Sequence, residues 1–187
     1  KELDFSYAFE DKSRFRVNAF TQRGYLGAAL RLISNKAKTI KELNLPAILS
    51  DFAKKEQGFF LVVGPIGHGK STTLASMVEE INHTSAKHIM TVEDPMEYLF
   101  VQDKSIIDQR EVRFDTADFK TAMRSMFRQD INVAMIGEMR DVETISTAVT
   151  AAETGHLILS SLHTNNAAQT GDRIIDSFPS NQQNQIR

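Results

Sequence analysis

The chain has 187 residues, of which 41% are hydrophobic and 25% are charged, a balance typical of a globular protein with one full α/β domain and a smaller piece. The net charge of −2 gives no overall basic field, so we expect no nucleic-acid partner. Cysteine is absent, which excludes disulfides and thiolate metal sites, and no apolar run approaches the ~18 residues of a membrane helix, so we expect no direct membrane insertion.

The N-terminal part of the chain predicts β-structure. Residues 14–20 alternate polar and apolar side chains with a period of two, as a strand does. Residues 28–33 fit either a strand or a helix, and the polar, lysine-rich stretch that ends at Pro46 predicts a linker. We therefore predict three parts: the C-terminal part of a small N-terminal domain at 1–34, a linker at 35–45 and a larger domain at 46–187. Both ends lack terminating signals, and we expect a fragment of a longer polypeptide.

The larger part alternates strand and helix patterns, which predicts an α/β domain with a mainly parallel sheet. A helix is predicted at 47–55, before the first strand. The predicted strands are 59–63, 88–92, 133–136 and 157–161, and the predicted helices are 70–82, 116–128, 141–152 and 166–175. In such sheets ligands bind beyond the carboxyl ends of the strands. Every polar cluster discussed below follows one of these strands directly.

Residues 64–71 read Gly-Pro-Ile-Gly-His-Gly-Lys-Ser and fit the P-loop pattern G-x-x-x-x-G-K-[ST] between a predicted strand and a predicted helix. The backbone N–H groups of such a loop cradle phosphates; Lys70 would reach the β- and γ-phosphates of ATP, and the Ser71 hydroxyl would bind Mg²⁺. The alternative is a glycine-rich turn that holds a lysine and a serine by chance, and the two flanking elements disfavour it. The predicted nucleotide-binding residues are Gly64, Pro65, Ile66, Gly67, His68, Gly69, Lys70, Ser71 and Thr72.

Three carboxylates follow the predicted strand 88–92: Glu93, Asp94 and Glu97. Carboxylates this close repel one another unless a cation or ordered water uses them, and phosphoryl transfer needs both a held magnesium ion and an oriented water. A solvated acidic turn is the alternative. Beside a P-loop we prefer the functional interpretation.

Glu138 follows the apolar strand 133–136, which is the Walker B arrangement. A carboxylate there would lie near Mg²⁺, together with Ser71 and partly through water. The alternative is an ion pair between Glu138 and Arg140.

His163 follows the predicted strand 157–161 and could donate to the γ-phosphate. A lone histidine is more often structural, and we interpret His83, His88 and His156 in that way. No spacing of these histidines predicts a zinc site.

The larger domain shows no arginine placed to neutralise a γ-phosphate, but the N-terminal part offers several. Such arginines can come from another domain or subunit. The alternative for Arg16 is an ordinary surface position on a strand.

Taken together, the motifs resemble one family, the secretion-type ATPases that power bacterial type IV pili and type II secretion. The resemblance rests on ordered blocks at 15–20, 64–71, 91–97, 109–112, 137–141, 151–157, 162–164, 172–173 and 178–179. The wording Gln-Arg-Glu-Val at 109–112 and Gly-Glu-Met-Arg-Asp at 137–141 is similar to that of the retraction ATPases, the PilT type. Assembly and secretion relatives more often have isoleucine at the position of Met139.

The resemblance implies a RecA-like ATPase domain preceded by the tail of a PAS-like domain, and a homohexameric ring. It implies that Glu97 activates the attacking water, that Glu138 is the Walker B carboxylate and that His163 contacts the γ-phosphate. Arg16 and Arg31 match the arginines that reach the phosphates from the N-terminal domain. It also implies a motor for pilus retraction and twitching motility, cytoplasmic and peripheral to the inner membrane, acting on an inner-membrane pilus platform protein.

Three residues depart from the family pattern. Ile66 and His68 replace the usual threonine and serine, and Asn132 replaces an aspartate before Walker B, which weakens the expectation of full catalysis. Two alternatives therefore stay open: a pilus-assembly or type II secretion ATPase, and a regulatory subunit that binds nucleotide but hydrolyses it poorly. A small-molecule kinase is disfavoured, because no second substrate pocket or lid pattern is visible.

Overall fold

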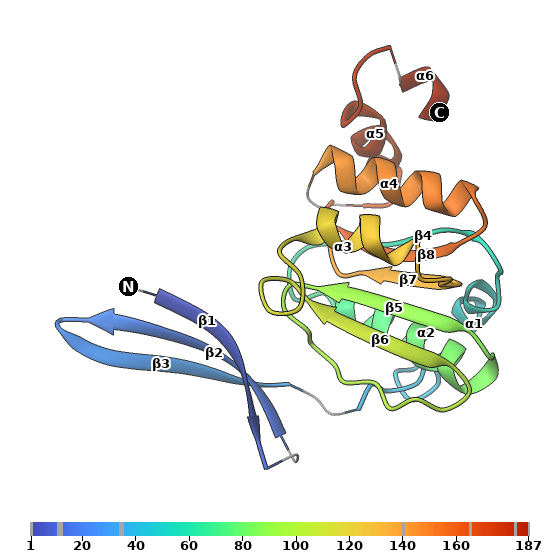
Figure 1. Cartoon of the computed structure of the whole chain (residues 1–187). Helices are drawn as coiled ribbons and strands as arrows, with labels where there is room; N and C mark the ends of the chain where they lie inside the picture. Colours follow the sequence, from blue (N-terminus) through green and yellow to red (C-terminus); the bar gives the residue numbers. More distant parts are fainter. Residues whose placement is uncertain are drawn as a thin grey trace.

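The computed structural model describes residues 2–10, 13–33, 36–139, 141–164, 166–181 and 183–186. It contains two separate sheets, a three-stranded one near the N-terminus and a five-stranded one flanked by helices (Figure 1).

The first sheet is antiparallel, in the order β1-β2-β3, with β1 at Glu2–Phe9, β2 at Ser13–Gln22 and β3 at Tyr25–Ile33. β2 contains the predicted strand, and β3 resolves the choice between strand and helix at 28–33 in favour of a strand. β1 was not predicted as a separate strand, although its odd positions are all apolar.

The register of this sheet gives it one apolar and one polar face. Ser6 lies opposite Arg16, and Arg16 lies opposite Arg31, so these three side chains share a face because directly opposed residues do. Arg14 is on the same face, two positions along β2. The other face carries exposed apolar side chains such as Leu3, Tyr7, Leu30 and Leu32.

The second sheet is parallel throughout, in the order β4-β8-β7-β5-β6. Its strands are β4 at Gly58–Val63, β5 at His88–Glu93, β6 at Ile106–Glu111, β7 at Val133–Ile136 and β8 at Leu157–Leu162. This confirms the predicted α/β class with a parallel sheet. The edge strand β6 was missed, because only its first two residues are apolar and one of its faces is largely open.

Helices cover both faces of the parallel sheet and enclose two apolar cores (Figure 1). One core contains Met77, Val78 and Ile81 of α2 (Lys70–Thr84), with α1 (Ile48–Ala53) beside it. The other lies under α3 (Phe119–Met126), α4 (Val142–Glu153) and α5 (Ala168–Asp176), and the short α6 (Gln183–Ile186) follows α5.

Caps decide where two of the helices begin. Asp141 accepts a hydrogen bond from the Thr144 N–H at 2.8 Å, so α4 starts directly after it, and Gly155 follows α4 with a φ of 105°. Asp118 caps α3 in the same way, at 2.6 Å from the Thr121 nitrogen. The predicted start of that helix at residue 116 was therefore too early.

The segment predicted as a linker packs onto the second sheet. Ala37 and Ile40 are buried, and Ile40 belongs to the same core as α2. The division at 1–34, 35–45 and 46–187 remains a proposal, with these contacts attaching the middle segment to the larger part.

β4, β5, β7 and β8 bring their carboxyl ends to one edge of the parallel sheet, since all four run in the same direction. The P-loop, the acidic cluster, Glu138 and His163 follow these four ends. Among the residues that the structure describes, none of the helices has the length and apolarity needed to cross a membrane.

Candidate functional site

The P-loop adopts a conformation that only its glycines accommodate without strain. Gly64, Gly67 and Gly69 have φ values of 149°, 80° and 80°. Gly69 is the N-cap of α2, and no side chain among the described residues caps it. The first N–H groups of α2 are therefore left to a ligand, as expected for an anion cradle.

Lys70 is folded back over the loop. Its ammonium group donates to the Gly64 carbonyl oxygen at 2.9 Å and to that of Pro65 at 3.0 Å, and only 8% of the residue is exposed. The same nitrogen lies 3.3 Å from Nδ1 of His163.

His163 connects Lys70 to Glu138. Its Nε2 lies 3.1 Å from Oε1 of Glu138. An ammonium group can only donate, so Nδ1 accepts from Lys70 and Nε2 carries the proton that faces Glu138. The residues that follow β4, β7 and β8 thus form one chain of polar contacts, which the sequence did not predict. The alternative partner of Glu138, Arg140, lies outside the described residues.

A cavity of about 370 Å³ opens beside this chain of contacts. It lies within the size range of small-molecule sites. Eight of the predicted site residues line it: Arg16, Ile66, Gly67, Lys70, Ser71, Glu97, Glu138 and His163.

Glu93 also lines the cavity, and sequence reasoning did not single it out from its acidic neighbours. It is 6% exposed, it accepts a hydrogen bond from Thr91 Oγ1 at 2.9 Å, and burial raises its pKa to about 7. Gly137, which follows β7, packs against it: a Cβ on Gly137 would lie 3.4 Å from the Glu93 Cα, at the limit of ordinary van der Waals contact. The signal in the sequence was its position as the first polar residue after an apolar strand.

Glu97 lies at the exposed side of the cavity, and its backbone N–H donates to Oε2 of Glu93 at 3.3 Å. The next residue, Tyr98, pairs its hydroxyl with Thr72 Oγ1 at 3.0 Å. That contact directs the Thr72 side chain to Tyr98, and Thr72 is not among the residues that line the cavity.

The two predicted arginines approach from the three-stranded sheet. Arg16 lines the main cavity, and both Arg16 and Arg31 line a neighbouring one of about 190 Å³ that Glu97 and Tyr98 also bound. The structure therefore brings these arginines to the carboxyl edge of the parallel sheet.

The three residues that depart from the family pattern lie outside the centre of the cavity. Ile66 is 84% exposed at its mouth, and His68 is exposed as well. Asn132 precedes β7, at the amino edge of the sheet, where its Oδ1 accepts from the His88 N–H at 2.8 Å. Asn132 therefore lies at the opposite end of the strand from Glu138 and does not line the cavity.

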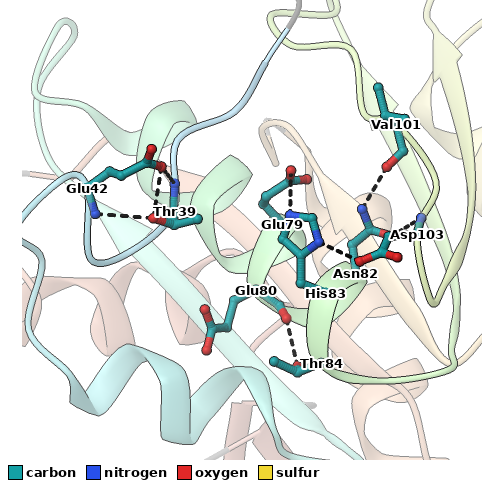
Figure 2. A network of polar contacts seen from close by, with 9 residues as sticks. All are labelled: Thr39, Glu42, Glu79, Glu80, Asn82, His83, Thr84, Val101 and Asp103. Atoms are coloured by element: carbon teal, nitrogen blue, oxygen red, sulfur yellow. Dashed lines mark hydrogen bonds and ion pairs between the residues drawn. The ribbon is translucent and has the colours of Figure 1, made fainter.

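The C-terminal end of α2 holds a separate polar network, which Figure 2 shows. Asn82 is fully buried; its amide donates to the Val101 carbonyl at 2.8 Å and accepts from the Asp103 N–H at 3.0 Å. His83 lies between Asp103 at 2.8 Å and Glu79 at 3.0 Å. The hydrogen bond to Asp103, with a smaller contribution from Glu79, raises the pKa of His83. These contacts agree with a structural role for this histidine.

Comparison with known proteins gives consistent matches. The family model described as "Type II/IV secretion system protein" matches residues 5–182. The "Type IV pilus retractation ATPase PilT" of Pseudomonas aeruginosa is 46% identical over the whole chain, which covers 54% of that protein. The "Twitching motility protein" of Neisseria gonorrhoeae is also 46% identical, with the chain covering 50% of it. The chain thus spans about half the length of the curated relatives it matches.

Among solved structures, the crystal structure of the pilus retraction motor PilT with bound ADP superposes with a TM-score of 0.96 at 49% identity. The match covers 99% of this chain and 54% of that one.

Proposed function

The chain belongs to the type II/IV secretion system protein family, and on that premise we propose that it is the ATP-hydrolysing part of a type IV pilus retraction motor. The single observation that carries the proposal is the cavity in which the P-loop, Glu97, Glu138, His163 and Arg16 meet. The retraction ATPase relative and the ADP-bound motor structure support the choice of nucleotide and of motor class.

In the proposed reaction, a water attacks the γ-phosphate of ATP in line with the leaving oxygen. The α2 N-terminus and Lys70 bind the phosphates, and Lys70 exchanges its carbonyl partners in the loop for phosphate oxygens. Glu97, at the open side of the cavity, orients the water. Arg16 and His163 face the charge that develops on the transferred group.

The donor set suits Mg²⁺, which prefers oxygen ligands and keeps several waters. Ser71 offers a hydroxyl and Glu138 a carboxylate on the same cavity, and Glu138 would act partly through water. When bound, the ion would neutralise charge on the β- and γ-phosphates. Ser71 and Glu138 would hold it, while His163 keeps the Glu138 carboxylate oriented through Nε2.

We extend the proposal to the assembly that the family resemblance implies. The full-length protein would form a homohexameric ring, cytoplasmic and peripheral to the inner membrane, and would act on an inner-membrane pilus platform protein. Hydrolysis would change the angle between the two sheets' domains. An assembly or type II secretion ATPase is the second candidate within the family.

The test is steady-state ATPase activity of the full-length hexamer carrying Glu97→Gln. We expect a loss on the order of 100-fold, because an amide cannot orient and deprotonate water as a carboxylate does. Asp51→Asn, an exposed acid on α1, is the matched control and keeps wild-type activity. Activity of the Glu97 variant within a few-fold of wild type would contradict the assignment. Tight ATP binding without turnover in the wild-type ring would instead favour the regulatory alternative.

A further inference from the structure

Glu111 ties the three-stranded sheet to the parallel sheet. It is the last residue of β6 and only 6% exposed. Its carboxylate accepts from the Ser6 hydroxyl of β1, at 2.8 Å to Oε1 and 3.0 Å to Oε2. Arg14 of β2 places its guanidinium 3.6 Å from Oε2. A buried carboxylate is costly unless it is paired, so both contacts favour keeping the two sheets together.

The contacts of Glu111 lie next to the two arginines of the site. Ser6 is the register partner of Arg16, and Arg16 is the register partner of Arg31, so the three form one row across the sheet. Arg14 lies on the same face, on the same strand as Arg16. A carboxylate that holds Ser6 and Arg14 therefore fixes the position of Arg16, which lines the cavity with Lys70.

We propose that Glu111 is a positioning residue that holds the three-stranded sheet against the nucleotide cavity and so sets the reach of Arg16. The inference rests on the proposed ATPase function and adds a residue that does not line the nucleotide cavity. Since Arg16 serves the γ-phosphate, the contact acts on ATP and leaves ADP binding, which the P-loop provides, unaffected.

The test compares Glu111→Gln with wild type in the full-length protein, measuring affinity for ADP and for a non-hydrolysable ATP analogue. We expect the preference for the ATP analogue over ADP to fall about tenfold, the weight of one hydrogen bond to a charged group, with ADP affinity within about twofold. Removing a negative charge near an anion site would by itself favour the triphosphate. A fall in that preference therefore cannot come from bulk electrostatics.

Asp108→Asn is the matched control. It removes the same charge from the same strand, but Asp108 is exposed and pairs with His88, on β5. We expect it to leave the preference unchanged. An unchanged preference in Glu111→Gln, or an equal fall in Asp108→Asn, would overturn the proposal. Retained ADP binding in Glu111→Gln shows that the variant is folded.

A double-mutant cycle with Arg16→Gln tests the route of the effect. If Glu111 acts through Arg16, the double variant has the preference of Arg16→Gln alone, within about twofold. Effects that multiply instead would overturn the positioning role. These binding measurements need no turnover. A wild-type ring that fails to hydrolyse ATP, yet loses its preference on Glu111→Gln, would therefore refute the proposed ATPase activity and support the positioning role.

Discussion

Helix α2 begins at the P-loop and ends in the network of Figure 2, and its two ends treat their polar groups differently. At the start, the N-cap Gly69 offers no side chain, and the first two residues of the helix, Lys70 and Ser71, line the cavity. At the end, Asn82 and Nδ1 of His83 pair with the segment that connects β5 to β6, and Nε2 of His83 pairs with Glu79 of the same helix. One helix thus separates binding from anchoring: its first N–H groups are left to a ligand, while Asn82 and His83 near its end are held by side-chain contacts.

The largest expected effect is at the binding end. Lys70→Ala should lower the ATPase activity of the full-length protein by about 100-fold or more, since it removes the cation nearest to the transferred phosphate. Unfolding in urea should change little, because the lysine's partners are two loop carbonyls and Nδ1 of His163, contacts that a bound ligand is expected to replace. Lys54→Ala, at an exposed position, is the control with unchanged activity. A large loss of stability in Lys70→Ala would contradict the division of α2 into a binding end and an anchoring end.

The anchoring end should show the reverse pattern. Asn82→Ala should lower the free energy of unfolding by about 2–4 kcal/mol, because the Val101 carbonyl and the Asp103 N–H lose their partner. Urea unfolding followed by circular dichroism measures it. Asn18→Ala removes an exposed hydrogen bond that the Asn18 side-chain amide donates to Asp4, and it should lower the free energy of unfolding by less than about 0.5 kcal/mol. Equal effects of the two variants would show that burial of the Asn82 network contributes nothing.

The smallest effect is the pH dependence of His83. Its pKa is raised, so its protonated form stabilises the fold fully below the unfolded value of 6.5, and this contribution is lost as pH rises through the folded value. The side chain is 44% exposed, so the loss should be under about 1 kcal/mol. Urea unfolding at about pH 6 and about pH 9 should show a steeper decline in wild type than in His83→Gln. If the free energy of unfolding falls equally with pH in wild type and in His83→Gln, the charge of His83 does not stabilise the fold.

The central parts of the molecule could be predicted from sequence because their patterns are local. The strands β4, β5, β7 and β8 are short apolar runs between turn signals, and each is followed by its functional motif. The spacing of the P-loop glycines by itself predicts the tight backbone turn of that loop. Long-range pairing is not local: nothing near Glu111 in the sequence indicates that it meets Ser6, 105 positions away.

The missed elements have physical reasons as well. β6 is an edge strand, and half of its side chains need no apolar partner. Glu93 looked like one of three equivalent acids, and only the packing of β7 against it shows that it alone is buried. Burial is a property of the assembled sheet, which a single strand's sequence does not carry.

The burial of Glu93 makes the stability of the fold depend on pH. Its pKa is raised from 4.5 to about 7, so the folded chain binds this proton more tightly than the unfolded chain does. Stability therefore falls as pH rises between these values, and at higher pH the deficit is about 3 kcal/mol. An uncharged side chain at this buried position would avoid that loss of stability. The buried Glu93 beside the cavity therefore lowers the free energy of unfolding, as residues at functional sites commonly do.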